Sequence, residues 1–204
     1  MWYYNATIIK TPKSLTVDGV TYPSAIFRDA EQLSSLGVKP YSEVRVDQRY
    51  YWTGQLTIDD SGDEAIGTYT TTDRDVDKLK EGMLSTINSQ VASKQGAIDW
   101  YWARASKKGG KDVPAEISDY ATTIYYEQNE KEAEVNALTT LEEIIDYENK
   151  PFTETRKVAI YDDEGNVSYG DETETNTRHI NMLKHWTANP TDEVDPAFVS
   201  LTKD

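Results

Sequence analysis

The chain has 204 residues, and 37% of them are hydrophobic, which is enough for a folded core and excludes global disorder. Asp and Glu number 36 against 21 Lys and Arg, so the net charge at pH 7 is −15. Such a surface repels nucleic acid and anionic lipid, and we expect neither as a partner. The sequence has no run of the roughly 20 apolar residues that span a bilayer and no signal layout at its start, so we expect no membrane segment. With 0 cysteines, disulfides, thiolate nucleophiles and cysteine-ligated metals are excluded.

Residues 1–71 carry short alternating runs separated by turn residues, which predicts a small β-rich anchoring module. The Asp18-Gly19 pair stands between β-branched residues, as in a two-residue type I′ hairpin. The stretch 29–36 suits a short helix, because Gly37 follows where a left-handed C-terminal cap belongs.

The second half of this module is predicted to form a strand, a turn and a returning strand. Alternation runs from Val44 to Ile58, and the polar residues 59–63 form the turn. Residues 66–70 then supply the partner strand.

The apolar spacing changes from two to about four at Thr72, which predicts that helices occupy residues 72–149. Thr72 and Asp75 resemble a capping box, so the first helix is expected to run from there to about Ser106. A loop rich in Gly and Lys follows, and Pro114 opens the second helix as its first residue. Short loops imply antiparallel neighbours, so we expect an antiparallel helical hairpin.

A third helix completes this region after a break near Asn136. Thr140 and Glu143 match the capping-box pattern, in which each residue bonds the backbone of the other. We therefore predict a last helix over 141–147.

Residues 150–204 are predicted to form a β-hairpin and an extended arm. The strands of the hairpin would be 157–161 and 167–169. Residues 179–186 suit a short helix. Beyond Thr187 the sequence shows little periodicity, and we expect an arm that becomes ordered only on a neighbouring chain. The fold class that follows from all three regions is α+β.

The residue patterns that carry catalysis or metal binding are missing. The acidic turns at 59–64 and 162–166 lack the ligand spacing of a calcium loop. His179 and His185 lie six residues apart, whereas metal-binding pairs on a helix lie three or four apart. The sequence contains no serine-nucleophile elbow, Walker A loop or dinucleotide-binding glycine motif, and neighbouring acids are expected on solvated helix faces. We therefore predict no catalytic residue, no metal and no cofactor.

Aromatic residues give the strongest signal in the sequence, which has 14 Tyr and 5 Trp. Adjacent residues face different sides of a helix or strand, so some neighbouring rings must be exposed or contact another chain. Tyr and Trp combine a large apolar body with a polar tip and are enriched at interfaces. The candidate interface residues are Tyr50, Tyr51, Trp52, Trp100, Trp102, Tyr125, Tyr126, Trp186 and Phe198. Carbohydrate stacking on such rings is the alternative.

Two parts of the sequence resemble bacteriophage tail proteins. Tyr-Pro-Ser-Ala-Ile-Phe at 22–27, Leu-Gly-Val-Lys-Pro-Tyr at 36–41 and Asp-Gln-Arg-Tyr-Tyr at 47–51 resemble the opening module of virion tail proteins, especially those of marine cyanobacterial phages. The second part is similar to the helical hairpin at the end of many tail-fibre and tail-fibre-assembly proteins. It consists of Asp99-Trp100, Arg104, Val113-Pro114-Ala115-Glu116-Ile117 and Tyr120. Ala121 departs from this order, in which Arg is usual, so an ionic contact is not expected there.

The resemblance spans about residues 20–150 and implies a non-enzymatic structural component of a phage tail, at a fibre, baseplate or adaptor position. It implies other tail proteins as partners, a homo-oligomer in the virion, and the host cytoplasm as the place of assembly. The helical hairpin and the C-terminal arm would dock on neighbouring tail subunits. Two alternatives stay open, a tail-fibre assembly chaperone and a carbohydrate-binding or depolymerising tail component.

Overall fold

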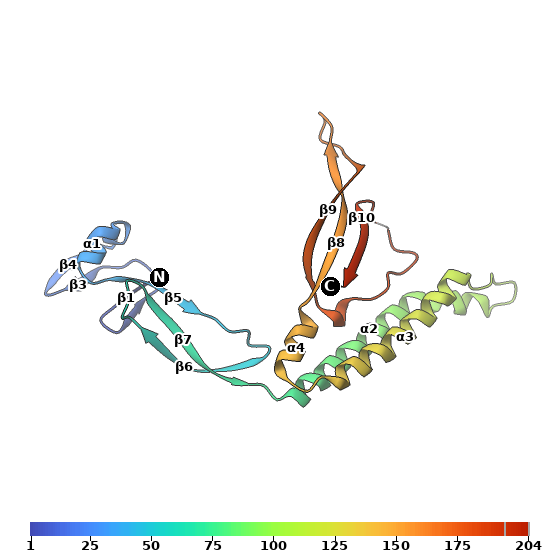
Figure 1. The fold of residues 1–204 in the computed structure, drawn as a ribbon, viewed down its shortest axis with the longest axis horizontal. Helices are drawn as coiled ribbons and strands as arrows, with labels where there is room; N and C mark the ends of the chain where they lie inside the picture. The colour runs from blue at the N-terminus through green and yellow to red at the C-terminus, as the bar shows by residue number, and fades with distance from the viewer. Residues whose placement is uncertain (194, 204) are drawn as a thin grey trace. The chain divides into compact units, whose positions relative to one another are not determined.

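The computed structural model describes residues 1–193 and 195–203, which combine helices and strands and confirm the α+β class (Figure 1). The chain divides into two compact units, an N-terminal unit, Met1–Arg74, and a C-terminal unit, Asp75–Asp204. The predicted boundary after residue 71 lies close to this division. The helical region and the C-terminal hairpin, which we predicted as separate domains, belong to one unit.

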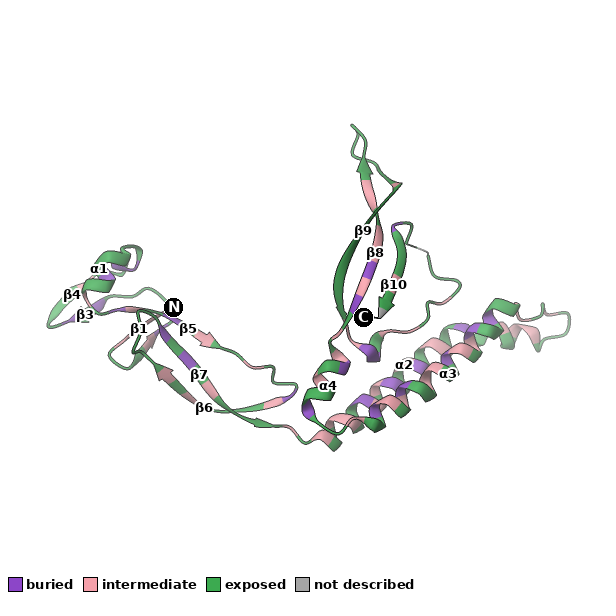
Figure 2. Cartoon of the chain, in the orientation of Figure 1, coloured by how far each residue is buried: buried purple, intermediate pink, exposed green. Residues whose placement is uncertain are grey.

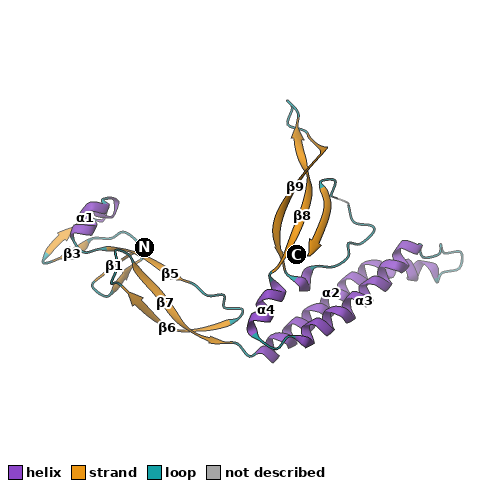
Figure 3. Ribbon diagram, in the orientation of Figure 1, coloured by secondary structure: helices purple, strands orange, loops and turns teal. Residues whose placement is uncertain are grey.

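The N-terminal unit is built on a five-stranded sheet with the strand order β2-β1-β5-β7-β6 and a separate β3-β4 hairpin (Figure 3). Neighbouring strands are antiparallel except β5 and β7, which run parallel. Its elements are β1 (Trp2–Tyr4), β2 (Thr7–Ile9), β3 (Leu15–Val17), β4 (Val20–Tyr22), the 3-10 helix η1 (Ser24–Arg28), α1 (Ala30–Ser35), β5 (Lys39–Val44), β6 (Tyr51–Asp59) and β7 (Ala65–Asp73).

Local signals in the first 40 residues are confirmed. Asp18 and Gly19 have φ values of 49° and 84°, the left-handed conformation that a type I′ turn requires at both central positions. Asp29 caps α1 by accepting a hydrogen bond from the Gln32 backbone N–H at 2.9 Å. Gly37, with φ of 72°, ends the helix as predicted.

The strand predicted from Val44 onward is wrong at its start. Strand β5 ends at Val44, and the chain turns before β6 begins at Tyr51. Asp47 makes this turn, because its carboxylate accepts hydrogen bonds from the Arg49 backbone N–H at 2.9 Å and from the Arg49 guanidinium at 2.6 Å. The predicted β6–β7 hairpin itself is confirmed.

The core of the N-terminal unit lies under the β3-β4 hairpin and α1. Trp2 packs edge-on against Phe27, with ring centroids 4.7 Å apart. The buried residues of this cluster are Ile9, Leu15, Val17, Ile26, Phe27, Leu33 and Val38. On the sheet, Tyr41 lies across Gly67, where an added Cβ would come within 3.0 Å of the Tyr41 ring. Glycine at 67 therefore allows the buried Tyr41 ring to cross strand β7.

The C-terminal unit combines a helical hairpin with a three-stranded sheet of order β10-β8-β9. Its elements are α2 (Val76–Ala105), α3 (Ala115–Ala137), α4 (Leu141–Glu148), β8 (Lys150–Tyr161), β9 (Val167–Ile180), the 3-10 helix η2 (Met182–Lys184) and β10 (Phe198–Lys203). Helix η2 packs against both α2 and α4. The sheet and the helices are therefore held together through η2 and the segment that follows it.

Helix α2 begins later than predicted. Thr72 belongs to β7, where it pairs with Trp52, so the capping box predicted at Thr72 does not form. Asp75 is the N-cap instead and accepts a hydrogen bond from the Lys78 backbone N–H at 2.9 Å. The predicted end near Ser106 is confirmed.

The remaining helix boundaries lie within one residue of the predicted ones. Pro114 immediately precedes the first residue of α3, one position before the N1 site predicted for it. Helix α4 has the predicted capping box. The Glu143 backbone N–H donates to Thr140 Oγ1 at 3.2 Å, and the Thr140 backbone N–H donates to Glu143 Oε2 at 3.1 Å.

Polar contacts between α2 and α3 confirm the antiparallel hairpin. Lys80 at the start of α2 donates to the carbonyl of Leu138, just after α3, at 2.8 Å. Gln128 donates to Asn88 at 2.9 Å in the middle of the pair. The buried residues on the facing sides are Met83, Ile87, Val91 and Ile98 of α2 and Ile117, Tyr120, Ile124 and Val135 of α3 (Figure 2).

The C-terminal hairpin is longer than predicted. Its strands extend to Lys150 on β8 and to Ile180 on β9, which pair with each other. The helix predicted over 179–186 is wrong, because His179 and Ile180 are taken into this pairing and only η2 turns after them. Thr153 lies opposite Thr177 and Thr155 opposite Thr175. Such Thr pairs suit a sheet face that is open to solvent.

The last part of the arm expected after Thr187 is ordered by contacts within its own chain, contrary to the prediction that it needs a neighbouring chain. This part, β10, pairs antiparallel with β8 of the same chain. An ion pair also connects this region to β8, because the Arg156 guanidinium lies 2.6 Å from the Asp195 carboxylate. The free backbone groups of β8 on the side away from β9 explain why this strand attaches there.

Candidate interaction surfaces

Six of the nine predicted interface residues have exposed side chains, namely Trp52, Trp100, Trp102, Tyr125, Tyr126 and Phe198. Tyr126 is the most open of them, at 68% of its full exposure. Tyr51 is half-buried. Large rings left this open on a folded chain are a common property of protein-binding surfaces.

Tyr50 is corrected by the structure, and Trp186 is turned partly inward. Tyr50 is buried, at 5% exposure, and its backbone carbonyl accepts a hydrogen bond from the Arg74 N–H at 2.9 Å. Trp186 is half-buried, and its indole N–H donates to the Leu183 carbonyl at 2.8 Å and to the Gln90 side chain. Burial therefore removes the Tyr50 ring from the candidate surface, whereas the Trp186 ring is held by contacts to α2 and η2 and stays partly exposed.

Some exposed rings are held in place by arginine. The Arg74 guanidinium lies 3.7 Å from the centroid of the Trp52 ring, and the Arg104 guanidinium lies 5.0 Å from that of Trp100. These are cation–π distances. The exposed faces of Trp52 and Trp100 are therefore presented by ordered side chains.

A second exposed apolar surface lies on the outer part of the β8–β9 hairpin, which we call the ribbon tip and define as Ile160, Tyr161, Val167 and Tyr169. Tyr161 is 69% exposed and Val167 is 48% exposed, and these two residues are paired across the strands. Strand β10 pairs with β8 only up to Arg156, so the ribbon tip belongs to a two-stranded section (Figure 1). Two-stranded hairpins are marginally stable alone, and a covering partner would stabilise this one.

The ribbon tip was missing from the sequence-based candidates. The sequence predicted the hairpin itself and therefore the alternation of its side chains. It carried no signal that pairing with β10 would end at Arg156 and leave the outer part of β8 with β9 as its neighbouring strand in the described chain.

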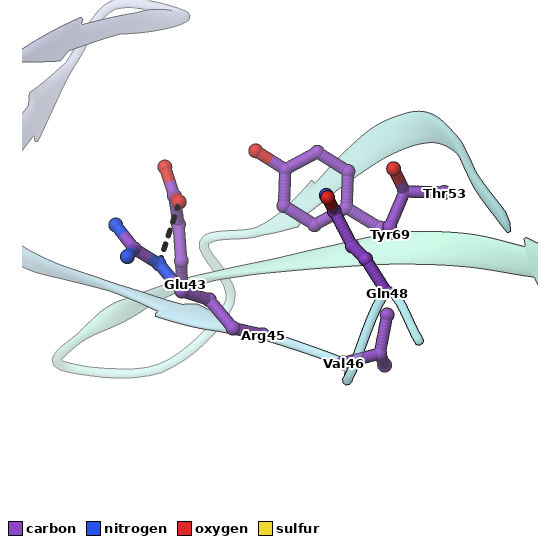
Figure 4. Close-up of a pocket in the computed structure, with 6 residues that line it drawn as sticks. All are labelled: Glu43, Arg45, Val46, Gln48, Thr53 and Tyr69. Atoms are coloured by element: carbon purple, nitrogen blue, oxygen red, sulfur yellow. Dashed lines mark ion pairs between the residues drawn. The ribbon is translucent and has the colours of Figure 1, made fainter. Parts of the chain in front are cut away.

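An open pocket of about 540 Å³ with a polar lining lies in the N-terminal unit (Figure 4). It is lined by Glu43, Arg45, Val46, Gln48, Thr53 and Tyr69. Arg45 lies 3.8 Å from Glu43, and the buried Tyr41 hydroxyl donates to the same carboxylate at 3.2 Å. Burial and this hydrogen bond raise the pKa of Tyr41. The pocket offers one aromatic ring and several hydrogen-bonding groups to a polar ligand.

The acidic turns use their carboxylates for the backbone. Asp59 accepts a hydrogen bond from the Ser61 N–H at 3.0 Å, and Asp162 accepts one from the Asn166 N–H at 2.7 Å. The Ser61 bond lowers the pKa of Asp59. The Asn166 side-chain amide, which donates to Asp162 at 2.9 Å, and then the Asn166 backbone bond lower the pKa of Asp162. Among residues 1–193 and 195–203, no three His, Asp or Glu side chains gather as a metal site requires.

Among those same residues, no helix combines the length and the apolar character needed to cross a membrane. Compared with known proteins, the chain matches no family model, no curated protein and no solved structure.

Proposed function

We propose that the chain is a non-enzymatic structural component of a bacteriophage tail that docks on neighbouring tail subunits. The assignment to a tail rests on the resemblance of residues 22–51 and 99–120 to tail and tail-fibre-assembly proteins. The helical hairpin and the ribbon tip would make the docking contacts, in place of the extended arm expected from the sequence.

The observation that carries this proposal is the ribbon tip. Tyr161 and Val167 are large, apolar, cross-strand neighbours that stand open to solvent on a projecting two-stranded hairpin. Burying apolar area on a partner contributes roughly 25 cal/mol per Å², and aromatic residues dominate such contacts. A surface of this kind favours binding to another protein.

Quantitative mass spectrometry of purified virions tests the proposal. A structural part of the tail is expected in a fixed copy number that is a multiple of three or six. Absence from particles, together with tight binding to a fibre protein in lysate, would contradict it and favour the assembly chaperone.

Variants at the ribbon tip test the surface itself. The double substitution Tyr161→Ser and Val167→Ser removes its apolar contacts while changing only exposed residues, so the fold is expected to persist. We expect the copy number per particle to fall. Thr175→Ser, an exposed change on β9, is the matched control. Unchanged incorporation of the double variant would exclude the ribbon tip as a docking surface.

Carbohydrate binding is a second candidate, favoured by the pocket around Tyr69. Its ring, the Glu43–Arg45 ion pair and the Gln48 amide combine stacking with the hydrogen-bonding groups that sugar hydroxyls need. Titration of the protein with a panel of neutral oligosaccharides, followed by calorimetry, tests it. Binding that is lost in Gln48→Ala and kept in Trp100→Ala would place the glycan in this pocket. No heat of binding with any member of the panel would reject this function.

A further inference from the structure

We propose that two copies of the chain associate side by side and antiparallel through their helical hairpins. The basic end of each hairpin would contact the acidic end of the other. The inference rests on the proposed docking role of the hairpin and names its partner, which is a second copy of this chain.

The basic end is the loop end of the hairpin, residues 100–111, which we call the hairpin tip. It carries Arg104, Lys107, Lys108 and Lys111 between the flanking exposed acids Asp99 and Asp112, although the whole chain has a net charge of −15. The three lysine side chains are exposed. Within the part of the chain that the structure describes, none of them enters an ion pair.

Exposed tryptophans accompany these charges. Trp100 and Trp102 are 51% and 41% exposed. Arg104 orders this end, because its guanidinium lies 5.0 Å from the Trp100 ring and donates to the Asp112 carbonyl at 3.3 Å. The hairpin tip therefore combines ordered apolar rings with positive charge, as expected of a surface that binds an acidic protein face.

The complementary face lies on the same chain. Residues 127–148, which we call the acidic end, hold eight Asp and Glu against Lys131 alone, and Lys131 is buried. Glu130, Glu142 and Asp146 are exposed there. Two chains of like net charge repel each other, but at physiological salt this repulsion is screened beyond about 8 Å. Short-range contacts between opposite charges at the two ends therefore outweigh the screened repulsion between the net charges of the two chains.

One copy cannot bring these two ends together. Helix α2 has 30 residues, which corresponds to a length of about 45 Å. The hairpin tip lies at one end of it, and α4, which carries part of the acidic end, lies at the other (Figure 1). A second copy laid antiparallel makes the contact between tip and acidic end twice, in a closed arrangement with two-fold symmetry. Tyr125 and Tyr126, both exposed, lie between the two contacts along α3.

Charge reversal tests this arrangement in the full chain by analytical ultracentrifugation at moderate ionic strength. We expect the wild-type chain to be a dimer. A tip variant, Lys107→Glu with Lys108→Glu and Lys111→Glu, and an acidic-end variant, Glu130→Lys with Glu142→Lys and Asp146→Lys, should each dimerise on the order of a hundredfold more weakly.

Mixing the two variants is the decisive step. Every contact in the mixed dimer is again complementary, so an equimolar mixture should recover the dimer. The variant Lys10→Glu with Lys13→Glu and Arg28→Glu reverses three exposed charges in the N-terminal unit and should remain dimeric. Circular dichroism of each variant verifies that the helices are intact.

A monomeric wild-type chain, a tip variant that dimerises as tightly as the wild type, or a mixture that stays monomeric would each overturn the inference. The proposed function has a separate readout. A chain that is monomeric in solution but present at fixed copy number in virions would end this inference and keep the docking role. A chain that dimerises in solution but is absent from particles would keep this inference and contradict the proposed function.

Discussion

The Lys131 ammonium donates a hydrogen bond to the backbone carbonyl of Met182, 51 residues further along the chain, at a distance of 2.7 Å. Both residues are buried. The same ammonium lies 5.0 Å from the ring of Trp186, and Glu127 accepts hydrogen bonds from the Thr187 backbone N–H at 3.2 Å. Helix α3 thereby fixes the segment that follows the β8–β9 hairpin, and the sheet and the helices become one unit.

Replacing Lys131 should change how stability depends on pH. Burial lowers the pKa of Lys131, although the nearby carboxylates of Glu127 and Glu134 act in the opposite direction. Between this lowered value and the ordinary value near 10.5, the unfolded state binds more protons, so the free energy of unfolding rises with pH. Lys131→Met removes this rise. In urea titrations, the free energy of unfolding of the wild type relative to that of the variant should therefore rise as the pH increases toward 10.5.

Lys184→Met is the control for this experiment, because Lys184 is exposed on η2. Its unfolding curve should track that of the wild type across the same pH range. A Lys131→Met variant that also tracks the wild type would mean that Lys131 stays solvated in the folded chain.

Tyr147 should govern part of the loss of stability in alkali. Its hydroxyl donates to Glu134 at 2.9 Å, and burial together with this hydrogen bond raises the pKa of Tyr147 well above its ordinary value of 10.0. Because the unfolded chain releases this proton first, the free energy of unfolding falls as the pH rises above 10. Tyr147→Phe should cost about 1 kcal/mol at neutral pH and flatten the alkaline decline. Tyr120 has a raised pKa too, so some decline remains.

Tyr126→Phe serves as the comparison, since that side chain is 68% exposed. Equal alkaline slopes for the two phenylalanine variants would show that the contact between Tyr147 and Glu134 has no part in the effect.

The capping box of α4 should be worth a measurable amount of stability. Thr140→Ala removes the acceptor of the Glu143 N–H and is expected to cost about 1 kcal/mol in urea unfolding. Thr122→Ala is the control, because this exposed residue lies within α3 and its hydroxyl bonds only the Ser118 carbonyl. A helix-interior Ala is favourable, so this variant should be as stable as the wild type or slightly more so. If Thr122→Ala lowers the free energy of unfolding as much as Thr140→Ala does, the capping box makes no specific contribution to stability.

Signals that depend on a few neighbouring residues could be predicted from the sequence. The Asp18-Gly19 turn, the Gly37 cap and the Thr140–Glu143 capping box depend on backbone conformations that only a few residue types favour. Each was found at its predicted position.

Features that depend on distant strands could not be predicted in this way. Thr72 has the right neighbour for a helix cap, but pairing with Trp52 keeps it in β7. Ile180 and Leu183 have helical spacing, yet strand pairing holds Ile180 opposite Lys150. The exposure of the candidate rings could not be predicted either, because elements remote in sequence decide how far Tyr50 and Trp186 are buried.

Asp195 should hold the segment before β10 against the sheet. Its carboxylate accepts hydrogen bonds from the Ala197 backbone N–H at 2.9 Å and from the Arg156 guanidinium at 2.6 Å. The backbone bond, followed by Arg156, lowers the pKa of Asp195, so this hold is present above the ordinary value of 3.8 and is lost as the pH falls below it. Asp195→Ala should release the segment at neutral pH and speed cleavage after Glu193 by a glutamate-specific protease, followed by mass spectrometry. Asp192→Ala changes a nearby exposed acid and should leave the cleavage rate unchanged. If both variants are cleaved at the wild-type rate, pairing of β10 with β8 alone holds the segment, and the Arg156–Asp195 pair contributes nothing to it.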